Sequence, residues 1–361
     1  MPAARAPEAQ TGATRSPRVL VVTAGTSGKK SFLADAFRER YGADVLAGKR
    51  WNERRIDRVL QPFGLGRIVA NARALNRDLL ERAGGGYDLI CVIKGLSVRR
   101  ETLEALRSAN PHAKLVCWTC DDQFLPHNQT PAFLRAAPAY DMIFTCKSHN
   151  VRNRELEGLG FQRVEFLYQA FSEADHHPRP NGASRHRGRV VFIGFAERKR
   201  FDYMNFLAAN GVEVDVYGTG WDRGPYRAEA HPNLKLHMKP LLGDEYADAL
   251  SNAAISLCFL RELNRDLHTS RTFEIPACGG FMLAERTGEH AELFREGEEA
   301  EFFETKEELL DKVRAYLAAP EQRAQVAKRG YERTRNSDYS YRAMVERIVQ
   351  QAFASQEGPT P

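Results

Sequence analysis

The stretch AISLCFLRELNRDLHTSRTFEIPACGGFMLAE, residues 254–285, decides the fold. It begins and ends with short apolar runs of the kind typical of parallel strands covered on both faces. Between them, TFEIPA predicts a helix that Gly279 and Gly280 end, with Pro276 as an irregularity inside it. A strand, a helix and a second strand in succession form the unit of a doubly wound α/β sheet.

Apolar runs and helical patterns alternate along the chain in two arrays, which predicts an α/β protein. The predicted strands are residues 18–23, 88–94, 114–119, 141–146 and 164–168 in the first array, and 189–194, 212–218, 234–238, 254–260, 280–285 and 301–303 in the second. Helices are predicted at 31–41, 100–109, 151–160 and 340–353, among others.

A polar segment at 172–188, rich in His and Pro, separates the two arrays and is typical of an interdomain linker. We therefore expect two Rossmann-like domains that face each other across a cleft, at 17–171 and 189–339. Residues 1–16 predict a disordered tail, because they are rich in Ala and Pro and lack the apolar core of a secretion signal. Residues 340–361 would form a last helix and a tail.

Composition narrows the class of protein. Of the 361 residues, 43% are hydrophobic and 27% charged, with no apolar run of the length of a transmembrane helix. The six cysteines lie mostly in apolar stretches, which favours reduced thiols in a cytoplasmic protein. The net charge of +5 is weak support for nucleic-acid binding, and we expect none. The basic segment 49–77 is either a solvated helical face or a surface for an anionic acceptor or membrane.

The stretch TAGTSGKKS, residues 23–31, superficially resembles a nucleotide-binding phosphate loop. Gly25 precedes Gly28 by three positions rather than five, and Lys29 is followed by Lys30 rather than Ser or Thr. We interpret it as a glycine-rich turn that lines the cleft from the first domain. A phosphate-loop NTPase that uses Lys29 stays as an alternative, and it would turn over ATP with Mg²⁺.

A second candidate site is DDQFLPHNQT, residues 121–130, which follows a predicted strand. In doubly wound folds, ligands bind at the carboxyl ends of the strands. The two adjacent carboxylates, Asp121 and Asp122, together with His127 could therefore act as a base or bind sugar hydroxyls. The alternative is a polar surface turn.

The strongest candidate site surrounds the helix predicted after residue 268. Thr269 or Ser270 is its expected N-cap, and Arg271 adds a permanent positive charge. Free N–H groups at a helix start, together with that charge, form a site suited to a diphosphate. Asp266 and Glu274 stand in acid-x7-acid spacing around it. Glu274 could instead be a purely structural capping or paired residue.

These residues also resemble a known family. Residues 271–329 resemble the C-terminal segment of the glycosyltransferases related to the spore-maturation protein CgeB, within the GT-B class. The shared motifs are Arg271-x-Phe273-Glu274, Ala277-Cys278-Gly279, Glu292-x-Phe294-x-x-Gly297 and Tyr316-Leu317…Pro320-x-x-Arg323. Residues 118–122, 169–180 and 190–207 are similar to further segments of the family, so the resemblance covers roughly 86–345.

The resemblance implies roles for several residues. Glu274 would bind the ribose of a nucleotide, and Asp266, shorter than the usual Glu, would contact the donor sugar. Arg198 and Arg200, which follow Gly194, would neutralise the leaving diphosphate, and each charge-assisted contact of this kind is worth about 1.5–3 kcal/mol. Gly218 would belong to the same donor site. The helix at 340–353 would cross back onto the first domain.

The function that we predict is a cytoplasmic glycosyltransferase, either free or peripheral to a membrane, that uses a nucleoside-diphosphate sugar such as a UDP-sugar. The resemblance favours retention at the anomeric carbon and implies that no metal or other cofactor is needed. Asp122 is the candidate general base should the enzyme invert the configuration at that carbon. The acceptor, a glycan, lipid-linked or protein, would bind the first domain. The rival from another class is a catalytically silent binding or regulatory protein with the same fold, which the shorter Asp266 supports.

Overall fold

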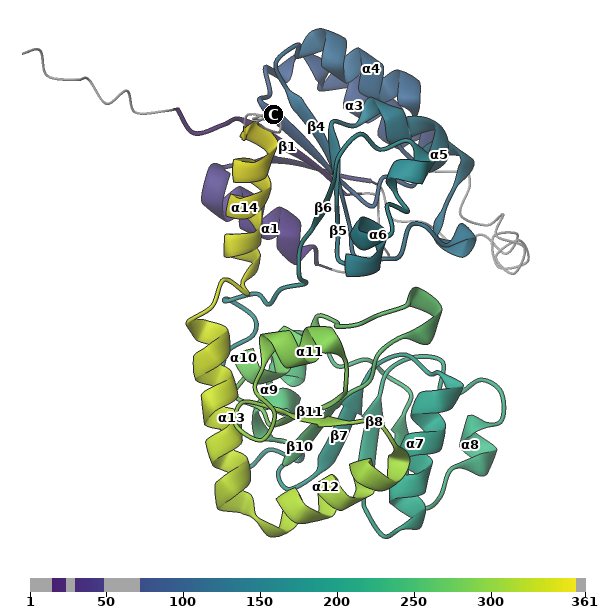
Figure 1. Ribbon diagram of the computed structural model, residues 1–361, viewed down its shortest axis with the longest axis vertical. Coiled ribbons are helices and arrows are strands. Elements are labelled where there is room, and N and C mark those ends of the chain that lie inside the picture. The colour runs from purple at the N-terminus through teal and green to yellow at the C-terminus, as the bar shows by residue number, and fades with distance from the viewer. Residues whose placement is uncertain (1–14, 24–29, 49–71, 355–361) are drawn as a thin grey trace, which may run out of the picture.

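The computed structural model describes residues 15–23, 30–48 and 72–354, which form two α/β domains (Figure 1). The first is a six-stranded sheet in the order β2-β1-β3-β4-β5-β6, with every neighbouring pair parallel. Its strands are β1 (Val19–Thr23), β2 (Asp44–Ala47), β3 (Leu89–Ile93), β4 (Lys114–Thr119), β5 (Met142–Thr145) and β6 (Val164–Phe166).

Two layers of helices cover this sheet, because its central strands are apolar on both faces; every residue of β3 is buried. The helices α1 (Phe32–Tyr41) and α14 (Tyr341–Phe353) pack on one face, through Phe37 and Met344 among others. The helices α3 (Ala72–Glu81), α4 (Arg100–Ala109) and α5 (Pro131–Ala136) cover the other. The short helix α6 (Ser148–Arg152) follows β5.

The second domain is also a six-stranded parallel sheet, in the order β12-β11-β10-β7-β8-β9. Its strands are β7 (Val190–Ile193), β8 (Val214–Tyr217), β9 (Leu234–His237), β10 (Ile255–Cys258), β11 (Met282–Glu285) and β12 (Glu301–Phe303). Counted along this domain the order is 3-2-1-4-5-6 read from the β9 edge, which is the order of the dinucleotide-binding Rossmann fold.

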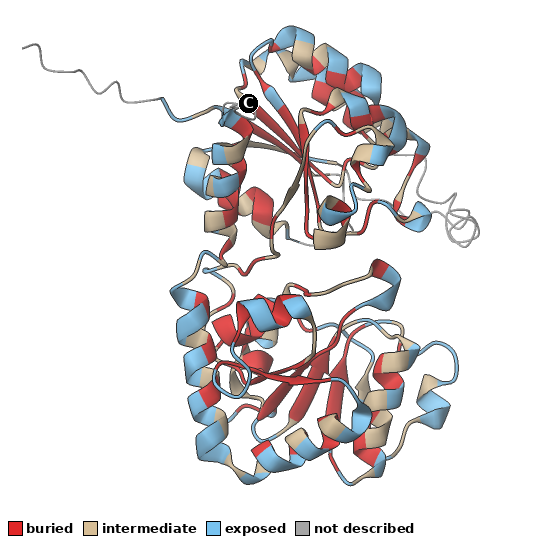
Figure 2. Ribbon diagram, in the orientation of Figure 1, coloured by how far each residue is buried: buried red, intermediate tan, exposed pale blue. Residues whose placement is uncertain are grey.

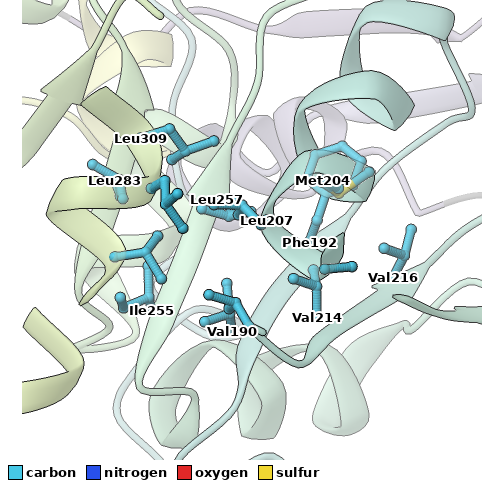
Figure 3. Packing of buried hydrophobic residues seen from close by; sticks show 14 of the residues in the cluster. Val190, Phe192, Met204, Leu207, Val214, Val216, Ile255, Leu257, Leu283 and Leu309 are labelled. Atoms are coloured by element: carbon cyan, nitrogen blue, oxygen red, sulfur yellow. The ribbon is translucent and has the colours of Figure 1, made fainter. Parts of the chain in front are cut away.

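Seven helices among the described residues surround this second sheet: α7 (Arg198–Ala209), α8 (Tyr226–Glu229), α9 (Gly243–Asn252), α10 (Arg271–Ala277), α11 (Gly288–Leu293), α12 (Lys306–Ala318) and α13 (Pro320–Arg335). Figure 3 shows the core on one face, where Met204 and Leu207 of α7 and Leu309 of α12 pack against Val190 and Leu257. In both domains the strands are the most deeply buried elements (Figure 2).

The predicted fold class is confirmed. Each predicted strand is present, and the last helix does cross back, since α14 packs on α1 of the first domain (Figure 1). The prediction missed the edge strand β2. A continuous helix at 151–160 was wrong: α6 ends at Arg152, and Arg154 adopts a left-handed φ of 52° that an α-helix cannot continue through. In the described part of the chain, no helix has both the length and the apolarity to cross a membrane.

Candidate active site

The candidate site lies at the carboxyl ends of the strands of the second sheet, at the point where the order of the strands reverses. β7 and β10 are neighbours there although β8 and β9 come between them in the chain. Doubly wound sheets bind ligands at this switch point, outside the carboxyl ends of the strands. This end of the sheet faces the first domain, because the loop after β10 contacts the loop after β4: the Asp122 backbone N–H donates to Asn264 Oδ1 at 2.8 Å.

Helix α10 begins at this end of the sheet and stops as the sequence predicts. The Thr269 hydroxyl accepts a hydrogen bond from the Arg271 backbone N–H at 3.0 Å, whereas the Ser270 side chain makes no capping bond. Arg271 Nε donates to the carbonyl oxygen of Ile193, the last residue of β7, at 2.5 Å. The Arg271 guanidinium therefore ties α10 to β7 and lies at the switch point itself.

Glu274 lies one turn into α10, and its side chain is only 9% exposed. Its carboxylate accepts a hydrogen bond from the Tyr246 hydroxyl at 2.5 Å and lies 3.9 Å from His176 Nε2 of the interdomain segment. Burial and the charge of Glu274 raise the pKa of Tyr246 well above its usual value, so this tyrosine stays a donor. Glu274 is thus held at the junction of the two domains by a hydrogen bond to one of its carboxylate oxygens, Oε2.

Asp266 lies on a loop that extends from the second domain toward the first, seen as the green arm after β10 in Figure 1. Its carboxylate pairs with Lys147, which follows β5 of the first domain, and accepts a hydrogen bond from Asn264 at 2.8 Å. The Lys147 side chain is 1% exposed and that of Asp266 8%. A fully buried ion pair therefore joins the domains at the residue predicted to contact the sugar.

Arg265, next to Asp266, makes a second charged connection between the domains. Its guanidinium donates to Asp122 at 2.5 Å and to both oxygens of Glu155 at 2.9 and 3.0 Å. Burial alone would raise the pKa of Asp122, but hydrogen bonds from His149, Arg265 and Asn150 hold it well below its usual value. A carboxylate that is so well satisfied is a poor general base, so this geometry argues against the predicted alternative role of Asp122.

Asp122, His149 and Glu155 are also the described residues whose ligand atoms, within 4.8 Å of one another, could hold a metal ion. The Arg265 guanidinium already bridges both carboxylates of this group. The cluster is therefore an ion-pair network in which Arg265 supplies the positive charge.

The two arginines predicted to face the diphosphate differ sharply. Arg200 is buried, and its guanidinium donates to the carbonyl oxygens of Leu260 at 2.8 Å and Phe195 at 3.0 Å. It thereby joins the loops after β7 and β10, close enough to Arg271 and Asp266 for electrostatic interaction. Burial lowers the pKa of Arg200. Guanidinium groups remain charged in proteins, so Arg200 keeps its positive charge.

Arg198, in contrast, is exposed at the start of α7. Its guanidinium pairs with Asp202 one turn further along the helix, at 2.9 Å, and with Glu229 of α8 at 2.8 Å. Two carboxylates already satisfy this side chain on the outer side of the domain, so the structure separates it from the group around Arg271.

The two glycines assigned to the donor site lie against each other. A Cβ on Gly218, whose φ is 148°, would come within 1.9 Å of the Gly194 carbonyl oxygen. The same oxygen accepts a hydrogen bond from Trp221 Nε1 at 3.0 Å. The loops after β7 and β8 thus require glycine for their own close packing, whether or not a ligand also approaches them.

Of the residues assigned to the acceptor side, His127 lies exposed in a short 3₁₀ turn (Pro126–Asn128) after β4. Gly25 and Gly28, Lys29 of the alternative NTPase, and most of the basic segment, residues 49–71, lie outside the described residues.

Two buried histidines that the sequence analysis missed support the start of α10. His268 accepts a hydrogen bond from the Gln169 backbone N–H at 3.0 Å, so its other ring nitrogen carries the proton that it shares with Glu289. The second histidine, His290, lies 2.9 Å from the Thr272 hydroxyl. These polar contacts fix the loop and the first turn that carry Asp266 and Arg271.

Comparison with known proteins agrees with this geometry. Residues 199–350 match the family described as glycosyl transferase-like. No curated protein sequence matches the chain. Because the family match covers most of the second domain after β7 and most of α14, it bears on the half of the molecule that carries Arg271 and Glu274.

Solved structures match over nearly the whole chain. Anabaena HepE in complex with UDP-glucose shares 12% identity, covers 92% of this chain and 98% of its own, and has a TM-score of 0.64. Sucrose-phosphate synthase from Thermosynechococcus elongatus shares 12% identity over 93% and 99%, with a TM-score of 0.66. An alpha-glucosyltransferase solved with UDP-glucose and DNA shares 14% over 93% and 100%, with a TM-score of 0.67.

The fold is therefore that of the GT-B glycosyltransferases. Together with the family match on the second domain, it supports glycosyltransferase activity for this chain.

Proposed function

We propose that the second domain binds a nucleoside-diphosphate sugar, with UDP as the nucleotide, and that the sugar passes to an acceptor held by the first domain. The observation that carries this proposal is the position of Arg271, fixed on the end of β7 at the switch point, with Asp266 and Glu274 on either side of it in the chain. The UDP-glucose complexes of two structures with this fold support the choice of donor.

The chemistry that we propose for this site is stabilisation of the departing diphosphate. Arg271 would donate to the phosphate oxygens, and Arg200 would add positive potential from behind, since its own hydrogen bonds go to backbone carbonyls. Fixed charges of this kind act most strongly where protein excludes water. Protein cations would then do what a divalent metal does elsewhere, so we propose a metal-independent reaction.

Asp266 would bind the donor sugar and Glu274 the ribose, each through its second carboxylate oxygen. Lys147 and Asn264 both donate to Oδ1 of Asp266. Tyr246 donates to Oε2 of Glu274, so the protein partners can stay in place. We further propose the CgeB-like subgroup, retention at the anomeric carbon and a cytoplasmic location, which the six free cysteines support.

The second candidate function is a nucleotide-sugar-binding protein without catalysis. Asp266 and Glu274 both pair with groups of the protein, and this favours the second function. Side chains that already bind each other could fix the site in a single conformation that does not take part in catalysis. Slow hydrolysis of UDP-glucose in the absence of an acceptor, if it is lost in Arg271→Gln, would show that the protein is an enzyme. Binding with no hydrolysis or transfer would decide for the binding protein.

The donor site is tested by Glu274→Ala, with UDP binding measured by calorimetry. Loss of the ribose contact should weaken UDP binding at least tenfold, which corresponds to one charge-assisted hydrogen bond of about 1.5 kcal/mol. Glu245→Ala, which removes an exposed acid of α9, is the matched control and should bind UDP normally. Unchanged UDP affinity in a folded Glu274→Ala variant would contradict the site.

A further inference from the structure

A hollow of about 690 Å³ lies on the first domain among α3, α4 and α5. Five arginines contribute to its lining, against a single acidic residue, Glu101; they are Arg73, Arg77, Arg99, Arg100 and Arg135. They come from three helices and a loop that are separate in the chain, so the positive charge is gathered by the fold.

The arginines are not equally occupied. Arg77 pairs with Asp78, and Arg100 with Glu104 one turn along α4. Arg73, Arg99 and Arg135 are exposed and have no acidic partner within the described ranges of the chain. Three guanidinium groups around one concave surface therefore keep their planar donor forks available, and such forks match phosphate oxygens in pairs.

The position of the hollow also points to a ligand. Asn76 of α3 donates to the Ser97 carbonyl oxygen at 2.8 Å and accepts from the Arg99 backbone N–H at 2.9 Å. These bonds hold the hollow against the loop that leaves β3. In the order β2-β1-β3-β4-β5-β6, the switch point lies between β1 and β3. The hollow thus lies beside the loop of β3, one of the two strands between which a sheet of this order binds its ligand.

We propose that this arginine hollow binds the phosphate-bearing part of a discrete acceptor molecule. That the ligand is an acceptor rests on the proposed function; that it carries phosphate rests on the hollow alone. The volume is that of a small-molecule site. A concave surface holds a compact ligand on several sides, whereas a flat bilayer would reach only its rim, so the geometry favours a single molecule over a membrane.

The test uses glucose 1,6-bisphosphate as probe, because it presents phosphates on a sugar without a nucleoside. Calorimetry at low salt should detect its binding to the full chain. The triple variant Arg73→Gln/Arg99→Gln/Arg135→Gln should bind it at least tenfold more weakly. The control, Arg187→Gln/Arg329→Gln/Arg347→Gln, removes the same charge from exposed positions elsewhere and should bind like the wild type.

UDP binding is measured on the same samples, so that the two proposals can fail separately. Probe binding that depends on the three arginines, without any UDP binding, would keep the hollow and reject the proposed function. Absent probe binding, or equal loss in the control variant, would overturn the hollow whatever UDP does. Binding only to phosphatidylglycerol vesicles, without binding of the probe, would also overturn it in favour of a membrane surface.

Discussion

At the switch point of the second sheet, Arg200 and Arg271 are held against backbone carbonyls, with acidic groups close by. In the first domain, Arg99 and Arg135 lie exposed around an open hollow beside the loop that leaves β3. The two sheets also differ in strand order, with the switch point between β7 and β10 in the second domain and between β1 and β3 in the first.

The difference suits the two tasks that we propose. A nucleoside diphosphate has one charge pattern whichever sugar it carries, so a fixed set of buried charges can be arranged for it in advance. An exposed arginine keeps its rotamer freedom until a ligand orders it. Such a side chain can adapt to varied ligands, but ordering it on binding costs conformational entropy.

The largest effect on stability should come from the buried ion pair between Lys147 of the first domain and Asp266 of the second. Lys147→Met leaves the Asp266 carboxylate buried without its cation, which should lower the free energy of unfolding by about 3–5 kcal/mol. Urea denaturation followed by tryptophan fluorescence would measure the loss. Adding Asp266→Asn to the variant should recover part of it, because no unpaired charge remains.

Lys328→Met is the matched control, since that lysine pairs only across the exposed surface of α13. If Lys147→Met were as stable as this control, the pair between Lys147 and Asp266 would not be a buried contact that stabilises the protein.

A smaller effect, of about 3 kcal/mol, should appear as acid sensitivity of the second domain. Burial lowers the pKa of His290 from 6.5 to about 4. Between pH 6.5 and 4 the unfolded chain therefore binds a proton at this histidine that the folded chain does not bind. The free energy of unfolding should fall as the pH drops from 6.5 to 4 and level off below that.

Denaturation at a series of pH values would show this slope. The curve for His290→Gln, which has no imidazole to protonate, should be flatter by the same amount across that window. An identical slope in wild type and variant would mean that His290 does not stay neutral inside the domain.

The smallest effect should come from Arg198. Because it is exposed and pairs with Asp202 and Glu229, Arg198→Gln should change kcat by no more than about twofold. Arg200→Gln should lower kcat far more, since it removes a buried charge beside Arg271. A tenfold loss of kcat in Arg198→Gln would show that Arg198 does act in the site. It would also contradict the distinction drawn here between buried and exposed charge.

Sequence patterns were enough for the fold because each apolar run had the length of one buried strand. β2 escaped since it contains Asp44, lies at the edge of the sheet and buries only one of its four residues. The helix α10 was recognisable from Arg271 and the paired glycines at its end, because those signals are local.

The candidate site was predictable only where its residues are neighbours in the chain. Arg271 and Glu274 share one helix, and their spacing is visible in the sequence. Lys147 and Asp266 are 119 positions apart, and Arg265 and Asp122 are 143 apart. Such pairs depend on how two domains meet, which no local pattern encodes.

The last helix gives the chain an unusual order of assembly. Met344 and Ile348 of α14 complete the core of the first domain, although the whole second domain precedes them in synthesis. The two chain segments that cross between the domains meet at an isolated parallel β-bridge between Phe171 and Ser340. While the ribosome is still making the second domain, the first exposes an uncovered apolar face. Loss of the final helix by premature termination should therefore damage the amino-terminal half of the protein, the half made first.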